Sequence, residues 1–230
     1  MQPVKIEQTE ALAQSLLRQL VMVWVDFNSR LDKVPIIEKL NRGKLRIEDY
    51  QLFLSNHRQQ VVEGSRWIAR AASSISSEHE DLRSRFLRHA VAEHRDFRML
   101  ENNYVATGGR LEDILHGEKN IGTEALSAWM FHRASQPNPF DLLGAMFIIE
   151  GLGQNNARKW GESIQKQLNL PDEATSFLRY HGENDESHMQ EFEETLNSGI
   201  LTKDLVKAII KTAKVTARLY LLQLEEISNY

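Results

Sequence analysis

The chain has 230 residues and no stretch rich in proline, glycine or serine that is long enough to separate two cores, so we expect one domain over residues 1–230. Cysteine is absent, which excludes disulfides, zinc fingers and iron–sulfur clusters and leaves nitrogen and oxygen as ligands for any metal. A formal net charge of -4 gives no electrostatic reason to expect nucleic acid or an anionic membrane as a partner.

The amino terminus, MQPVKIEQTE, lacks the basic region and apolar core of a signal peptide. No run of 18 apolar residues occurs that could span a bilayer. We therefore expect a cytoplasmic protein.

Apolar residues recur every three or four positions along the chain, and strict alternation is hard to find. This pattern predicts an all-α protein of about seven helices. The predicted helices span residues 9–30, 47–72, 77–108, 123–134, 138–168, 171–197 and 202–227. The period of seven in the apolar stripe of the last one indicates a helix that packs along others.

Two helix starts carry recognisable signals. Ser77, with Glu80 three residues later, matches a capping box at the start of the third predicted helix. Asn138 followed by Pro139 gives the fifth helix the preferred order of cap and first-turn proline.

The sixth predicted helix carries three side chains that can bind metal. His181, Asp185 and His188 are separated by offsets of four and seven. At about 100° per residue, these offsets place all three on one helix face.

The third predicted helix repeats the same offsets at His89, Glu93 and Asp96. Its apolar stripe includes these polar positions. Two helices are therefore expected to direct acids and imidazoles inward.

The fifth predicted helix contains an isolated acid. Residues 139–153 (PFDLLGAMFIIEGLG) are apolar nearly all round, and Glu150 lies more than two turns after Asp141, which the helix dipole stabilises. A buried carboxylate without a partner costs several kcal/mol or is forced to protonate. Glu150 therefore needs a cation, a strong donor or a proton, and Gly151 and Gly153 would leave room beside it.

Two trios with a lone glutamate between them match the ligand set of a carboxylate-bridged pair of metal ions in a helical bundle. The carboxylates would balance the charge of two divalent ions, one of them bridging, and neutral imidazoles would fill the remaining positions. Iron, manganese or zinc would fit. Open coordination positions would face a cavity where dioxygen could be reduced.

Ordinary structural roles compete with this interpretation. A single inward histidine on a helix is more often a core residue bonded to a backbone carbonyl. Asp185 could pair with Arg179 or Lys159 as a structural ion pair.

Other candidates are weaker. His94 points about 100° away from Glu93 and is expected to be exposed, although it could substitute as a ligand if the helix is rotated. His57 lies on the apolar stripe of the second helix and could reach the site, with a structural role favoured. Glu63 lies off that stripe. The four tryptophans are expected in the core, and they are Trp24, Trp67, Trp129 and Trp160.

The order of the acids and histidines is specific: Glu150 is followed 31 residues later by His181-Gly-Glu-Asn-Asp185-Glu-Ser-His188, and a helix with Glu93 precedes both. This order resembles the heme-oxygenase-like diiron oxidases, a family of iron-containing redox enzymes. Residues 34–72, with a hydrophobic anchor, a glycine turn and a "Y..FL" helix, look like the opening of those proteins. The resemblance covers about residues 34–198.

The resemblance implies an all-α, heme-oxygenase-like, seven-helix up-down bundle. It implies iron ligands at Glu93, Glu150, His181, Asp185 and His188, with one more from the early helix. Members use two ferrous ions and dioxygen to oxidise amines, amino acids or fatty acids. We therefore expect a small-molecule substrate, catalytic roles for Glu150 and Asp185, and a protein that could form a homodimer.

One position departs from the family pattern. The family usually has a histidine at or near the position of Asp96. Asp96 could ligate directly, His89 or His94 could supply the imidazole, or one metal could bind weakly.

Other functions of related folds remain as alternatives. The superfamily also contains thiaminase II type proteins and the coenzyme PQQ synthesis protein C, which suggests a metal-free cavity for binding or acid/base work. Thiaminase II type proteins use a cysteine nucleophile, which this chain lacks. A ferritin-like bundle fits the spacing only in part. A scaffold without catalysis gives no reason for Glu150.

Overall fold

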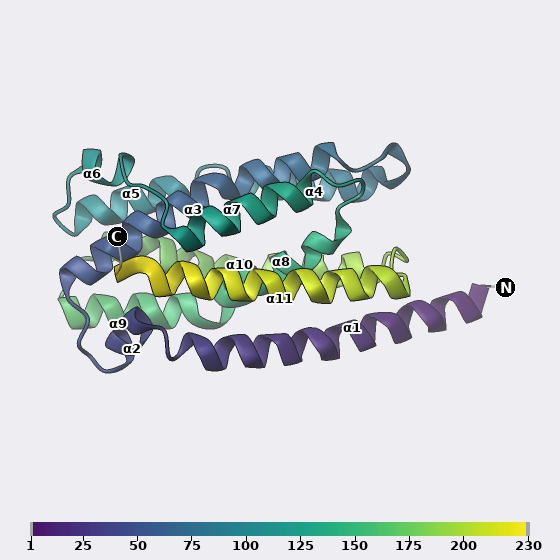
Figure 1. Cartoon of the computed structure of the whole chain (residues 1–230), viewed down its shortest axis with the longest axis horizontal. Helices are drawn as coiled ribbons and strands as arrows, with labels where there is room; N and C mark the ends of the chain where they lie inside the picture. Colours follow the sequence, from purple (N-terminus) through teal and green to yellow (C-terminus); the bar gives the residue numbers. More distant parts are fainter. Residues whose placement is uncertain (1, 229–230) are drawn as a thin grey trace.

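The computed structural model describes the backbone of residues 2–228 and the side chains of residues 10–183 and 192–227. Every regular element in that part of the backbone is helical, so the all-α prediction is confirmed. The long helices lie side by side along a common axis (Figure 1). They are α1 (Gln2–Leu31), α3 (Ile47–Ser73), α10 (Ser176–Leu196) and α11 (Lys203–Glu225).

Shorter helices complete the bundle. They are α2 (Pro35–Asn41), α4 (Glu80–Glu93), α5 (Phe97–Ala106), α6 (Leu111–Leu115), α7 (Ile121–Ala134), α8 (Leu143–Leu152) and α9 (Arg158–Leu168). The described backbone thus holds more helices than the seven predicted, partly because two predicted helices are interrupted. A turn at residues 94–96 divides the third into α4 and α5, and a π-helical turn at Gly153–Ala157 separates α8 from α9.

Both predicted capping signals were wrong. Ser77 begins a short 3-10 turn, and α4 starts at Glu80 without a side-chain cap at His79. Asn138 has a positive φ of 48°, and its Oδ1 accepts a hydrogen bond from the backbone N–H of Ser76 at 2.8 Å. Asn138 therefore makes a tertiary hydrogen bond instead of capping a helix. The Asn138-Pro139 pair marks a turn of the chain and not a helix start.

One cluster of buried hydrophobic residues runs from Ala13 to Ile227 and joins the helices. The predicted stripe of α11 is buried in it, including Val206, Ala213 and Leu224. No helix among the described residues is long and apolar enough to cross a membrane.

Candidate metal centre

Three predicted ligands meet where α4, α5 and α10 come together. Glu93 is the last residue of α4, Asp96 immediately precedes α5, and His181 lies in the second turn of α10. Each offers one ligand atom, and these atoms lie within 4.8 Å of one another. His181 Nε2 is 3.4 Å from Asp96 Oδ2. A metal ion between them would have two carboxylates and an imidazole as ligands.

The interruption between α4 and α5 shapes this cluster. Asp96 occupies the N-cap position of α5, where aspartate commonly accepts a backbone N–H. Here its side chain makes no capping bond. Asp96 is buried, and its Oδ2 has no hydrogen-bond partner in the part of the chain that the structure describes, although it contacts His181. The carboxylate is therefore directed to the imidazole and not to its own helix.

Glu150 also has an imidazole partner. His89 Nε2 of α4 lies 3.3 Å from Glu150 Oε1 of α8, and both side chains are about nine-tenths buried. The prediction that the isolated acid needs a donor or cation is consistent with this contact. His89, a further candidate ligand, thus lies beside Glu150.

The charges of the His89–Glu150 pair affect the ionisation of Glu93 in the three-residue cluster. Burial, and to a smaller extent the charges of Glu150 and Asp96, raise the pKa of Glu93 to about 7, although His181 and His89 oppose the rise. Carboxylates this close disfavour one another's ionisation. A divalent cation bound among them would reverse that effect by favouring the charged forms.

A cavity of about 90 Å³ adjoins the cluster. Its polar lining consists of His57, Gln60, His89, Glu93, Glu150 and His181. Its aromatic lining consists of Phe53, Trp67, Trp160, Phe177 and Tyr220. The acids and histidines therefore face a mostly apolar space. Trp67 and Trp160, which were expected only to fill the core, form part of its wall.

The π-helical turn and a glycine fix the position of α10. A Cβ atom on Gly182 would lie 2.7 Å from Arg158 Cβ and 2.8 Å from the Arg158 backbone nitrogen. The backbone of α10 therefore reaches the start of α9 only because residue 182 has no side chain. Since His181 is the adjacent residue, this contact helps to set its position. π-Helical turns occur often at functional sites.

Gly151 does not provide the expected space next to Glu150. A Cβ atom there would lie 3.2 Å from the Trp24 ring of α1. This glycine therefore lets α1 pack against α8. Gly153, in contrast, lines the cavity.

The beginning of α10 is held by a buried asparagine on α5. Asn103 Nδ2 donates to the Glu173 carbonyl and to Ser176 Oγ, and Asn103 Oδ1 accepts from the Phe177 N–H at 3.2 Å. Because Asp96 immediately precedes α5 and His181 follows on α10, these bonds align two of the three predicted ligands. Nothing in the apolar pattern singled out Asn103.

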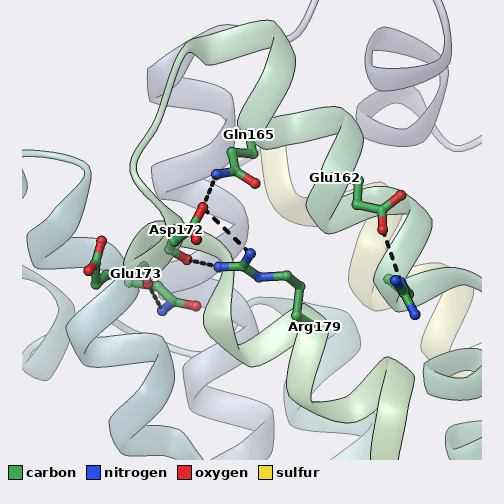
Figure 2. A network of polar contacts seen from close by, with 7 residues as sticks. Glu162, Gln165, Asp172, Glu173 and Arg179 are labelled. Atoms are coloured by element: carbon green, nitrogen blue, oxygen red, sulfur yellow. Dashed lines mark hydrogen bonds and ion pairs between the residues drawn. The ribbon is translucent and has the colours of Figure 1, made fainter.

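A polar network at the surface reinforces the same region (Figure 2). Arg179 contacts Asp172 with an N–O distance of 3.6 Å, and Gln165 of α9 donates to Asp172 Oδ1. Arg179 was one of the two alternative partners considered for Asp185, with Lys159 as the other. The side chains of Asp185 and His188 lie outside the described residues, so their roles stay predictions.

The weaker candidates have structural explanations. His94 is exposed, and its Nδ1 lies 2.6 Å from the Val91 carbonyl oxygen. Glu63 pairs with Arg66 and Lys119, each at 2.7 Å. Neither belongs to the cluster.

His57 lines the cavity among aromatic rings. It stacks on Phe53 with centroids 5.1 Å apart and meets Phe177 edge-on at 5.3 Å. Its Nδ1 has no hydrogen-bond partner among the described residues. Burial lowers the pKa of His57 to about 3, with a smaller effect from His181. The imidazole is therefore neutral near pH 7.

The neutral state of His57 predicts acid sensitivity. The unfolded chain takes up a proton near pH 6.5, whereas folded His57 does not until about pH 3, so stability falls as pH decreases between these values. From pH 7.5 to 5 we expect the metal-free parent to lose about 2 kcal/mol more than a His57→Phe variant. Urea unfolding at both pH values measures this difference. Equal losses would show that His57 does not control the acid response.

The family model described as "Iron-containing redox enzyme" matches residues 53–221. A comparison with curated protein sequences finds no match.

Several solved structures share the fold. A domain of unknown function with a heme oxygenase-like fold from Shewanella denitrificans has a TM-score of 0.86 at 20% identity, covering 93% of this chain and 92% of that chain. A TenA homolog from Pseudomonas syringae has a TM-score of 0.74 at 16% identity, covering 94% and 93%. Heme oxygenase-1 from Synechocystis, solved with heme, has a TM-score of 0.72 at 12% identity, covering 93% and 92%. The predicted heme-oxygenase-like fold is confirmed.

Proposed function

Because the chain belongs to the family of iron-containing redox enzymes, we propose that it uses iron and dioxygen to oxidise a small organic substrate in the cavity beside Glu93, Glu150 and His181. The observation that carries this proposal is the convergence of Glu93, Asp96 and His181 within 4.8 Å. This cluster adjoins the His89–Glu150 pair. We propose a site for two ions.

The side chains present suit iron. Carboxylate and imidazole donors bind ferrous iron in non-heme enzymes, and manganese or zinc would accept the same donors. The buried Asp96 Oδ2, which lacks a hydrogen-bond partner in the described part of the chain, is available as a ligand. The raised pKa of Glu93 reflects acids that a cation would stabilise in their charged forms.

Each residue has a proposed task. Glu93, Asp96 and His181 would hold one ion, and Glu150 would bridge to the second, for which His89 is a candidate ligand. Asp185 and His188 are predicted to add ligands from α10. Bound ferrous iron would supply the electrons that reduction of dioxygen requires.

The protein around the ligands would exclude water and orient the substrate. The cavity wall is mostly apolar, which lowers the local polarity and strengthens electrostatic interactions at the acids. Asn103 and Gly182 would keep α10 in register with α5 and α9. The cavity wall and these helix contacts would act in the same way whichever substrate binds.

Iron loading tests the proposal. After anaerobic incubation with ferrous iron and desalting, we expect the parent to retain two irons per chain and His181→Ala to retain at most one. His181 would be one of few ligands to its ion, and loss of a ligand removes much of the affinity. Metal analysis of the desalted protein measures the content.

His132→Ala is the matched control, because His132 is exposed on α7. It should load like the parent. Equal iron in His181→Ala and the parent would contradict the proposed site. A parent that binds no ferrous iron would favour a metal-free binding or acid/base role.

A further inference from the structure

The cavity is lined by a polar residue, His57, to which the proposed metal site assigns no role. His57 of α3 is only 8% exposed, and its Nδ1 has no hydrogen-bond partner among the described residues. A buried polar group without a partner is costly, since it has lost its bonds to water. This nitrogen is enclosed in the structure, so a ligand in the cavity would supply the missing bond after a small adjustment of the wall.

The rings around His57 would hold a flat apolar body. Phe53 and Phe177 contact the imidazole, and Trp67 and Trp160 line the same space. Aromatic side chains bury large apolar areas and favour offset or edge-to-face contacts with another ring. The wall is thus better suited to a ring than to a polar chain.

The charges lining the cavity disfavour an ionised substrate. No lysine or arginine contributes to its described lining, so a carboxylate would enter without a cationic partner. An ammonium group would be attracted to Glu93 and Glu150, where it would compete with the metal. An uncharged molecule avoids both problems.

The volume limits the size of the ligand. At about 90 Å³ the cavity is smaller than the roughly 150 Å³ cavity that accepts benzene in an engineered protein. A single ring would therefore require some adjustment of the wall. Larger ring systems would require a larger displacement of the wall, so the volume favours a single ring.

We propose that the cavity selects an uncharged substrate with one ring and that His57 forms a hydrogen bond with its polar group. The neutral imidazole can donate or accept, so a hydroxyl or an amide would serve. This inference rests on the proposed function, because it takes the cavity as the substrate site. It narrows the substrate from amines, amino acids or fatty acids to a neutral cyclic compound.

Three probes separate shape, hydrogen bonding and charge. Phenol and toluene have the same shape and differ in the hydroxyl group, whereas benzoate carries a charge near pH 7.5. Each is titrated into the metal-free full-length protein, and the indole N–H signals are followed by NMR. Phenol should shift the signals of Trp67 and Trp160, which line the cavity, and leave those of Trp24 and Trp129 unchanged.

His57→Phe retains a ring but removes the hydrogen bond. We expect it to weaken phenol binding about threefold to tenfold and to leave toluene unchanged or tighter. His116→Phe, at an exposed position, should bind both like the parent. Benzoate should bind the parent at least about tenfold more weakly than phenol, because its charge would be desolvated without a cation.

Unchanged phenol affinity in His57→Phe would overturn the role of His57, and benzoate binding as tight as phenol would overturn the selection for neutral ligands. If His57→Phe does not fold, the affinities of the parent for phenol and toluene test the proposal. Phenol must then bind more tightly than toluene, since an unbonded hydroxyl would be penalised, and equal affinities would refute the proposal. Because no iron is present, this outcome is independent of the iron-loading experiment.

Discussion

Replacing Glu150 with glutamine is expected to remove the stabilisation by iron while leaving the metal-free protein at least as stable as the parent. Glu150 is 8% exposed in an apolar helix, so a neutral amide of similar shape avoids the cost of burying a charge. The pKa of Glu93 should also fall towards its ordinary value, since the charge of Glu150 raises it. As a ligand, however, an amide is a poor replacement for a bridging carboxylate.

Thermal unfolding with and without ferrous iron under anaerobic conditions measures both effects. At a free iron concentration 100 times the dissociation constant, a parent that binds only in its folded state gains about 2.7 kcal/mol for each bound ion. Glu150→Gln should show little of this gain. An iron-dependent stabilisation equal to that of the parent would contradict a bridging role.

Asp141 provides the matched control, because it is the other acid of the same apolar segment. Its Oδ2 accepts hydrogen bonds from Arg133 Nε at 2.8 Å and from Thr212 Oγ1 at 2.6 Å. Asp141→Asn should therefore destabilise the metal-free protein by about 1–3 kcal/mol and leave the stabilisation by iron intact. If Asp141→Asn loses stability and keeps the stabilisation by iron, while Glu150→Gln does the reverse, Asp141 has a structural role and Glu150 acts as a ligand.

Much of this site could be predicted from the sequence because its signals are local. Glu93 and Asp96 are three residues apart, which brings them together on a helix and also in the turn that replaces it. Glu150 was conspicuous because its neighbours are apolar. Pairing across helices could not be predicted in this way: the contacts of His181 with Asp96 and of His89 with Glu150 depend on how α4, α8 and α10 pack.

The interruptions of the helices had no clear local signal. The turn at residues 94–96 contains no proline or glycine, so the apolar pattern continued through it. The same pattern identified Trp67 and Trp160 as inward-facing. Periodicity reports which face of a helix is covered, but a covered face can border either close-packed atoms or a cavity.

Close approach of two helices is another feature that periodicity does not report, and it leads to a prediction for Gly182. Replacing Gly182 with alanine should destabilise the metal-free protein by about 1–3 kcal/mol. The new methyl group would lie 2.8 Å from a backbone nitrogen of Arg158, so α10 or α9 must shift. The shift would displace His181 and weaken iron binding as well. Urea unfolding and iron titration measure the two consequences.

Gly64→Ala is the control, since a Cβ atom at Gly64 in the middle of α3 meets no atom within 4 Å. There the better helix propensity of alanine should stabilise the protein by about 0.5–1 kcal/mol. If Gly182→Ala were also stabilising, α10 would not be in close contact with Arg158, and the position of His181 would need another explanation. Loss of stability with normal iron binding would instead mean that the helices separate without moving His181. Only the combined loss supports Gly182 as the residue that allows α10 to bring its histidine to the acids of α4 and α5.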